Sequence, residues 1–456
     1  MAAPLRLFFS RHLVTSRVST PLLCSQYRFL STLSPTHPHE FPAATPPPPP
    51  ANTDAPLARL PTASLIRALL LHTITGSPTL LALGTKVMLK TADNIERIPP
   101  LKWAVDKTFY VCPTTPPHPP FVTYATPNYI PMLTSVQAHY CAGSTPTEVT
   151  QTATALCSLG YSGLILAYAR EVEASPVASA AAAAAARTDI DHWLAGTLKT
   201  ITLSTPGDFV AIKLTGAGPA CLPLLSSLRP CTDIPELATA LDTICTAARE
   251  RRVGLLVDAE QAGLQQGVDR WAVYFMRRHN TPGHPAVVYN TYQMYLKRSA
   301  GTLRDHMALA EKEGWRLGVK LVRGAYLHSD PRDLIHGTKE ATDSAYDSAA
   351  EHLIKKGVDT VIASHNKASI ENALRLRGKG DGMLVFAQLM GMADELSLSL
   401  VGRAPVLKYA VWGTTGECLK YLLRRAEENS DAVGRSEENY RAVVDELRRR
   451  VGTWGR

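Results

Sequence analysis

Short apolar runs alternate with longer segments of helical periodicity between residues 160 and 430. Apolar runs of this length are typical of strands buried on both faces of a parallel sheet. The predicted strands are Gly163–Tyr168, Phe209–Leu214, Val253–Val257, Ala286–Tyr289, Leu317–Val322, Thr360–Ala363, Met383–Phe386 and Val406–Val411. The predicted helices cover residues 191–201, 234–251, 263–279, 291–313, 338–357, 367–377, 393–401 and 416–429.

This alternation has the size and order of a (β/α)8 barrel, because eight strands each precede a helix over about 270 residues. A doubly wound open sheet is the alternative. It would normally carry a glycine-rich phosphate turn after a strand, and the chain offers only the fragment Gly216-Ala217-Gly218. We therefore expect an α/β protein with a TIM-type (β/α)8 barrel and an N-terminal helical extension.

The N-terminal residues differ in composition from the rest of the chain. Residues 1–39 contain four arginines and no acidic residue. An N-terminus rich in Arg and Ser and free of acids is typical of a mitochondrial presequence, whereas Arg11 and His12 interrupt the apolar core of a secretory signal. The predicted divisions are a transit peptide (1–39), a Pro-rich linker (40–58), a helical and loop region (60–135), the barrel (136–440) and a helical tail (441–456).

Charge and cysteine content exclude several classes of protein. The net charge of +8 includes the four N-terminal arginines, so the remaining excess is too small and too scattered to predict nucleic-acid binding. The eight cysteines form no C-x-x-C pair, which argues against a zinc site and a disulfide framework and for a reducing compartment. No apolar run is long enough for a transmembrane helix. Residues 64–88 could lie on a membrane surface, although core packing explains such segments more often.

Polar side chains gather where the predicted strands end. The C-terminal strand ends of a (β/α)8 barrel carry its chemistry, so these groups should face one mouth together. One strand-end Asp or Lys alone is more often a helix cap or a paired charge. The candidates in chain order are Glu171, Lys213, Thr215, Asp258, Glu260, Gln261, Asn290, Tyr292, Gln293, Lys320, Arg323, Tyr326, Ser364, His365, Asn366, Gln388, Leu389 and Tyr409.

The last predicted helix carries a second candidate feature. Tyr421, Arg424, Arg425 and Glu428 fall on neighbouring positions of one helix face. Two guanidiniums can bind a carboxylate bidentately, although a solvated charged face is the commoner reading of such a run. The chain has neither a zinc-binding HExxH nor a Gly-x-Ser-x-Gly nucleophile motif. A cationic mouth of this kind suits a phosphate-bearing ligand together with a small acid.

These strand-end motifs resemble the proline dehydrogenase family. The resemblance rests on seven groups of residues: 139–143, 256–261, 289–293, 320–326, 363–366, 388–392 and 421–429. It implies a monofunctional FAD-dependent enzyme that oxidises L-proline to 1-pyrroline-5-carboxylate by hydride transfer to flavin N5. It also implies transfer of electrons to ubiquinone at the matrix side of the mitochondrial inner membrane.

The resemblance implies a role for each site residue. The proline carboxylate would be held by Lys213, Arg424 and Arg425, with Asp258 supporting the lysine. The pyrrolidine ring would lie against Tyr326, Leu389, Tyr409 and Tyr421. Gln293 and Lys320 would hydrogen-bond the flavin ring, and the FAD phosphates would be bound by Arg323, Ser364 and His365. Glu428 would lie near the ribose or orient the carboxylate clamp formed by Arg424 and Arg425. Glu171 would act as a gate that pairs with Arg424.

The sequence departs from bacterial members of the family at two sites. Those members usually exchange the charges at Lys320 and Arg323, and many have Trp in place of Leu327. Tyr409 favours proline over 4-hydroxyproline as substrate, since relatives that prefer hydroxyproline are expected to have a smaller residue there. Two alternatives stay open from the sequence: a hydroxyproline dehydrogenase, and a degenerate barrel kept as a scaffold.

Overall fold

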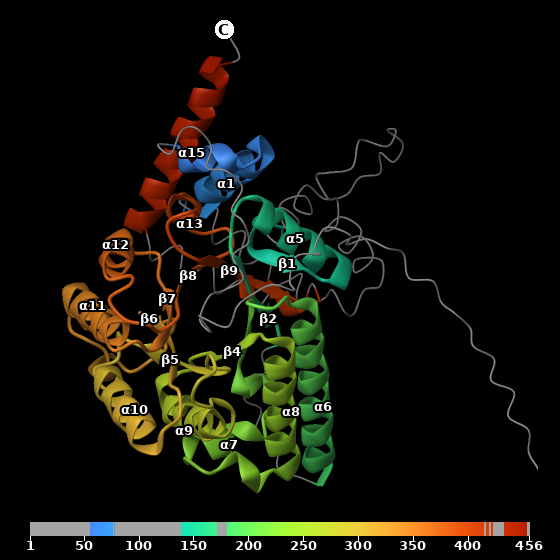
Figure 1. Ribbon diagram of the computed structural model, residues 1–456. Helices are drawn as coiled ribbons and strands as arrows, with labels where there is room; N and C mark the ends of the chain where they lie inside the picture. The colour runs from blue at the N-terminus through green and yellow to red at the C-terminus, as the bar shows by residue number, and fades with distance from the viewer. Residues whose placement is uncertain are drawn as a thin grey trace, which may run out of the picture. The chain divides into compact units, whose positions relative to one another are not determined.

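Eight parallel strands close into a barrel in the computed structural model (Figure 1). The structure describes residues 55–75, 77, 138–170, 180–414, 416–418, 421–422 and 433–453, without the side chains of 74–75, 180–185, 433–438 and 453. The barrel strands are β2 (Gly163–Tyr168), β3 (Phe209–Ile212), β4 (Gly254–Val257), β5 (Val288–Gln293), β6 (Gly318–Val322), β7 (Asp359–Ala363), β8 (Leu384–Leu389) and β9 (Val406–Trp412). The predicted (β/α)8 barrel is therefore confirmed.

The barrel closes through β9, which pairs with strands on both sides. Tyr409 is in register with Ile165 of β2 and with Leu389 of β8. Beyond Tyr409, β9 extends past the end of β8, and the short strand β1 (Cys141–Gly143) pairs with this extension. All the pairings are parallel, so every strand presents its C-terminal end at the same mouth.

Helices between the strands form the outer layer (Figure 1). They are α6 (Ala180–Leu203), α8 (Pro235–Arg251), α9 (Ala262–His279), α10 (Ser299–Glu313), α11 (Lys339–Lys355), α12 (Lys367–Arg375) and α13 (Asp394–Leu400). The connection from β3 to α8 also holds η2 (Leu214–Ala217), α7 (Cys221–Ser226) and η3 (Cys231–Asp233). Two of the helices begin at side-chain caps: Thr338 accepts from Ala341 N, and Asn366 accepts from Ser369 N.

The strands are apolar on both faces, as expected for a sheet buried inside helices. Successive residues of β4 divide between two clusters: Leu256 packs inside the barrel, and Leu255 and Val257 pack between strands and helices. Phe209 and Tyr289 meet edge to face inside the barrel, with ring centroids 5.3 Å apart. This alternation leaves polar side chains inside the barrel mainly near the strand ends.

The N- and C-terminal helices pack together beside the last barrel helix. Both η1 (Pro56–Arg59) and α1 (Thr62–Thr75), the described part of the helical extension, contact α15 (Val433–Thr453), and η1 also contacts α13. Arg450 donates to the carbonyl of Leu60 at 2.8 Å and to the hydroxyl of Thr62 at 2.8 Å. A further helix, α5 (Pro146–Ser158), begins with a capping box and packs on β1.

Four predicted boundaries near the mouth were wrong. The fourth strand extends to Gln293 and α10 begins only at Ser299, because the aromatic and β-branched residues after Val288 suit a strand better than a helix. The second predicted strand, observed as β3, ends at Ile212 and not at Leu214. The seventh, observed as β8, ends at Leu389 and not at Phe386. None of the helices in the described ranges is long and apolar enough to cross a bilayer.

Candidate active site

Three side chains from distant strands meet at the centre of the mouth. The Asp258 carboxylate, at the end of β4, accepts from Lys320 Nζ at 2.6 Å and from the Tyr409 hydroxyl at 2.7 Å. The Lys320 ammonium lies 4.9 Å from the Tyr409 ring centroid. Asp258 is 8% exposed and Lys320 is 7% exposed. A buried carboxylate bonded to one ammonium and one phenol is balanced in charge and fixes both partners in direction.

The residues after β4 are held from both sides. Glu260 donates its backbone N–H to Gln265 Oε1 at 2.8 Å and accepts from Gln293 Nε2 at 2.9 Å. Its carboxylate accepts from the hydroxyl of Thr215 at 2.9 Å, and Thr215 is two residues after Lys213 in the chain. Lys213 is half-buried and stands at the start of η2. The loops after β3 and β4 are therefore joined into one rigid wall.

A glycine turn carries Tyr326 to the next part of the wall. Gly324 has φ of 149°, and a Cβ at this position would lie 2.1 Å from the ring of Tyr295. Only glycine fits so close an approach. Ala325 N donates to Gln293 Oε1 at 3.2 Å, and the Tyr326 hydroxyl donates to Ala259 O at 3.4 Å. Gln293 thus links this turn to the loop after β4.

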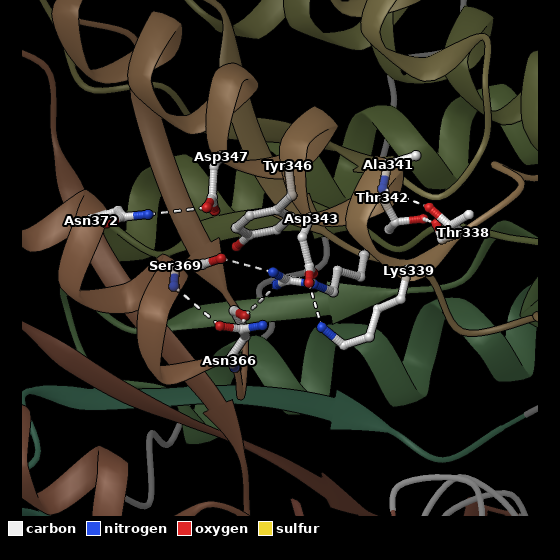
Figure 2. A network of polar contacts seen from close by, with 12 residues as sticks. Thr338, Lys339, Ala341, Thr342, Asp343, Tyr346, Asp347, Asn366, Ser369 and Asn372 are labelled. Carbon is white, nitrogen blue, oxygen red and sulfur yellow. Dashed lines mark hydrogen bonds and ion pairs between the residues drawn. The ribbon is translucent and has the colours of Figure 1, made fainter.

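Figure 2 shows a second polar network that includes Asp343 of α11 and Ser369 of α12. Arg323, which follows β6, is bonded to both. It donates to Asp343 Oδ1 at 2.7 Å and to the hydroxyls of Ser364 and Ser369 at 2.8 and 2.7 Å. Its guanidinium lies over the Tyr346 ring, 4.4 Å from the centroid. Burial acts to raise the pKa of the Asp343 carboxyl, but hydrogen bonds from Lys339 and Arg323 outweigh it, so this pKa is lowered.

The turn after β7 connects this network to β8. Asn366 N donates to the Ser364 hydroxyl at 3.1 Å, and His365 Nε2 accepts from Leu389 N at 3.1 Å. Gln388 donates through Nε2 to Ser364 O at 3.3 Å. Its Oε1 is buried and has no hydrogen-bond partner among the residues the structure describes. An unmatched acceptor of this kind is available for a ligand.

The helix after β9 is described only at its start. Glu417 accepts from Thr414 N at 2.8 Å and from the Tyr168 hydroxyl at 2.8 Å, which ties this start to β2. Burial, followed by the bond to Glu417, raises the pKa of Tyr168 to about 12. Tyr421 is 6% exposed and packs in the same cluster as Tyr409.

The structure brings several of the predicted site residues into contact, in two groups. The first group surrounds Asp258 with Lys320 and Tyr409, and the second surrounds Arg323 with Ser364. Leu327 is 51% exposed. Glu171, Arg424, Arg425 and Glu428 lie outside the described residues, so the predicted carboxylate clamp and gate stay predictions.

Sequence reasoning missed the residues that hold the mouth in place. Asp343 is the main example, and it changes the charge of the site: Arg323 and Lys320 are each paired with a carboxylate, so this part of the mouth is less cationic than its basic residues alone suggest. Its position four residues after Lys339 was the available signal, but this spacing fits an ordinary surface pair equally well.

The fold and the site define a class: a (β/α)8-barrel enzyme with its polar groups at the C-terminal strand ends. A family profile described as proline dehydrogenase matches residues 149–438. The chain is similar to "Probable proline dehydrogenase, mitochondrial" of Schizosaccharomyces pombe, with 33% identity over 390 residues, 69% of this chain and 79% of that protein. It is also similar to human "Proline dehydrogenase 1, mitochondrial", with 34% identity over 47% of this chain and 38% of that protein.

Solved structures of bacterial proline utilization A (PutA) share the fold. The protein from Bdellovibrio bacteriovorus gives a TM-score of 0.55 at 15% identity, covering 76% of this chain and 38% of that chain. A Bradyrhizobium japonicum mutant gives 0.56 at 18% identity, covering 87% and 45%. The chain thus spans less than half of the human relative and of these structures. The chain belongs to the proline dehydrogenase family and is accordingly an enzyme of proline oxidation.

Proposed function

We propose that this chain oxidises L-proline to 1-pyrroline-5-carboxylate with FAD as the hydride acceptor, and that its electrons pass to ubiquinone. The observation that carries the proposal is the contact of Asp258 with Lys320 and Tyr409 at the barrel mouth. Hydride transfer needs strict orientation of one C–H bond and little acid–base chemistry. A rigid, charge-balanced wall of this kind meets that need.

The described residues suit a flavin in their donors and acceptors. Gln388 Oε1 is a buried acceptor with no partner in the described part of the chain, and a ring N–H of the cofactor would satisfy it. Lys320 and Gln293 would hydrogen-bond the isoalloxazine edge, and Arg323, Ser364 and His365 would meet the phosphates near the start of α12. When bound, FAD supplies the hydride acceptor, N5.

The pocket residues would hold the substrate between polar and aromatic groups. Tyr409 is fixed by its bond to Asp258, and Leu389 is in register beside it on β8. Together with Tyr326 and Tyr421 they would wall the pyrrolidine ring. From the family resemblance, Lys213, Arg424 and Arg425 would bind the carboxylate, Glu428 would lie near the ribose, and Glu171 would close the site. The cations would also favour the neutral amine that hydride loss requires.

Tyr409 should also determine ring specificity. Its phenol lies at the mouth of the barrel and donates to Asp258 at 2.7 Å, where it would crowd a hydroxyl group on the substrate ring. We expect proline to be preferred over 4-hydroxyproline, and Tyr409→Ser to raise the relative activity on 4-hydroxyproline. Steady-state kinetics with both substrates measure this ratio, and an unchanged ratio would remove Tyr409 from the specificity argument.

The proposed location is the matrix side of the mitochondrial inner membrane. Relatives from fission yeast and human are named mitochondrial, and the composition of residues 1–39 is that of a presequence. Ubiquinone lies in the membrane, so the enzyme would have to approach the membrane surface to deliver electrons. Fractionation of mitochondria followed by carbonate extraction would test this location.

Anaerobic bleaching of the flavin band is the first test of the function. Purified protein is supplemented with FAD, and L-proline or 4-hydroxyproline is added without oxygen. Bleaching by L-proline and little by 4-hydroxyproline is the expected result. A bound flavin that proline does not reduce would remove the substrate, and a protein that binds no flavin would remove the cofactor.

A further inference from the structure

Lys408 is a buried charge that the proposed mechanism does not use. Its side chain is 1% exposed, and it precedes Tyr409 on β9. Side chains alternate along a strand, so Lys408 faces away from the barrel interior, toward α13. Burial lowers the pKa of Lys408, and the charge of Asp394 acts in the opposite direction.

The hydrogen-bond acceptors around the ammonium all belong to one short segment. Lys408 Nζ donates to Met392 O at 2.9 Å, Asp394 Oδ1 at 2.7 Å and Ser397 Oγ at 2.8 Å, and Leu389 O lies at 3.4 Å. An ammonium has three donors, and here they connect the end of β8 to the first turn of α13. The ammonium therefore binds the β8–α13 turn at several points at once.

The turn itself has an unfavourable backbone. Gly391 has φ of 73° and Ala393 has φ of 50°. A left-handed alanine is disfavoured because its Cβ crowds the backbone, so such a residue persists only where its surroundings hold it. His139 Nε2 contacts Gly391 O at 2.8 Å on the other side of the turn. The contacts of Lys408 and His139 supply this external hold.

The same turn determines where the substrate wall lies. Leu389 ends β8 and is in register with Tyr409 on β9. Its N–H donates to His365 Nε2, and the next residue, Met390, donates to Tyr409 O at 2.8 Å. A shift of the turn would therefore move Leu389 relative to both Tyr409 and His365.

We propose that Lys408 is a positioning residue whose ammonium holds the turn Leu389–Asp394, so that Leu389 and Tyr409 face the substrate ring at a fixed separation. The inference rests on the proposed function, in which these two side chains wall the pyrrolidine ring. Lys408 itself touches neither substrate nor cofactor. It acts from behind the strand, through the backbone of the turn.

The chain offers a matched control at the opposite end of the barrel. Arg316 and Asp359 form a second ion pair, with Nε and Oδ2 2.6 Å apart; Asp359 is 0% exposed and the Arg316 side chain 22%. Asp359 also accepts from Ala286 N and Met383 N, at the starts of strands. Breaking this pair tests the cost of losing a partly buried charge pair without disturbing the mouth.

The test compares Lys408→Met with Arg316→Met in two measurements. The first is amide hydrogen exchange, where Lys408→Met should speed exchange in residues 389–394 by about tenfold or more, while Arg316→Met leaves them unchanged. The second is kinetics on L-proline and on its six-membered ring homologue. Lys408→Met should lower kcat/KM for proline by about 10- to 100-fold and reduce the discrimination between the rings, since misplaced contacts cost orientation.

The outcomes separate this inference from the proposed function. If Lys408→Met leaves hydrogen exchange in residues 389–394 unchanged, Lys408 does not hold the turn. If exchange becomes faster while kcat/KM and ring discrimination stay the same, the turn does not position the substrate wall. Either result would overturn the role of Lys408. A wild-type protein inactive on proline would overturn the proposed function and the substrate part of this inference, and exchange would still decide whether Lys408 holds the turn. If Lys408→Met does not fold, Ser397→Ala removes one partner of the ammonium and should shift both measurements in the same direction by a smaller factor.

Discussion

The two ends of the barrel use buried polar residues in different ways. At the N-terminal end, Asp208 and Asn280 bind backbone groups, and Asp359 binds two backbone N–H groups together with Arg316. Asp208 accepts from Leu164 N at 2.7 Å, and Asn280 Nδ2 donates to Val288 O at 2.7 Å. At the mouth, the carboxylate of Asp258 binds other side chains. Backbone partners cannot move without unfolding a strand, whereas side-chain partners can rearrange toward a ligand. The first end serves stability, and the second is suited to binding.

The same substitution at both ends should show this difference. Asp359→Asn should lower the free energy of unfolding by about 3 kcal/mol or more, because all its partners are donors and an amide NH2 would face them. Specific activity of the folded enzyme should not change. Urea unfolding and kinetics on the same preparation measure both. Lost activity in fully folded protein would contradict the division between the two ends.

Asp258→Asn should have the converse effect at the mouth. The amide can still accept from Lys320, and the Tyr409 hydroxyl can turn to accept from the amide, so stability should fall less than with Asp359→Asn. The kcat/KM for proline should fall by about 100-fold, because Lys320 and Tyr409 lose the charge that orients them. A stability loss equal to that of Asp359→Asn, with normal turnover, would show a purely structural role.

His139, beside the mouth, should make the protein less stable in acid. Burial lowers the pKa of His139 from 6.5 to about 4, although Asp394 and the contact with Gly391 oppose the shift. In the unfolded chain His139 is therefore protonated below pH 6.5, whereas in the folded chain it becomes protonated only near pH 4. Stability should fall as pH falls through this window, by at most about 1.4 kcal/mol per pH unit from this group.

His139→Gln isolates this contribution, since glutamine can keep a hydrogen bond to Gly391 O and cannot take up the proton. Urea unfolding at pH 7, 6 and 5 should show a shallower loss of stability in the variant than in the wild type. Equal slopes for the two proteins would mean that His139 titrates in the folded state as it does in the unfolded chain.

The smallest effect is expected for an exposed ion pair near the strand starts. Arg403 and Glu371 are bonded through two contacts of 3.1 and 3.0 Å, with side chains 48% and 30% exposed. A double-mutant cycle with alanine should give a coupling energy of about 0.2–1 kcal/mol. A value near that of Asp359→Asn would indicate that burial does not decide the strength of ion pairs in this barrel.

The candidate site could be predicted in part from the sequence. Asp258, Lys320 and Tyr409 were found because each stands at or near the end of an apolar run, where a barrel places its chemistry. Their contacts with one another could not be predicted, since Asp258 and Tyr409 are 151 residues apart. Asp343 and Lys408 were missed for the same reason. A helical Asp and a strand Lys look ordinary until the groups beside them are known.

The sequence by itself determined the strand and helix order and the barrel, and it predicted candidate site residues at the strand ends. These follow from local periodicity, because a strand repeats every two residues and a helix every 3.6, and both can be recognised within a short window. Only the tertiary structure decided which charges are neutralised, as in the pairs of Arg323 with Asp343 and Lys408 with Asp394. Barrel closure sets these distances, and they depend on the packing of the whole domain.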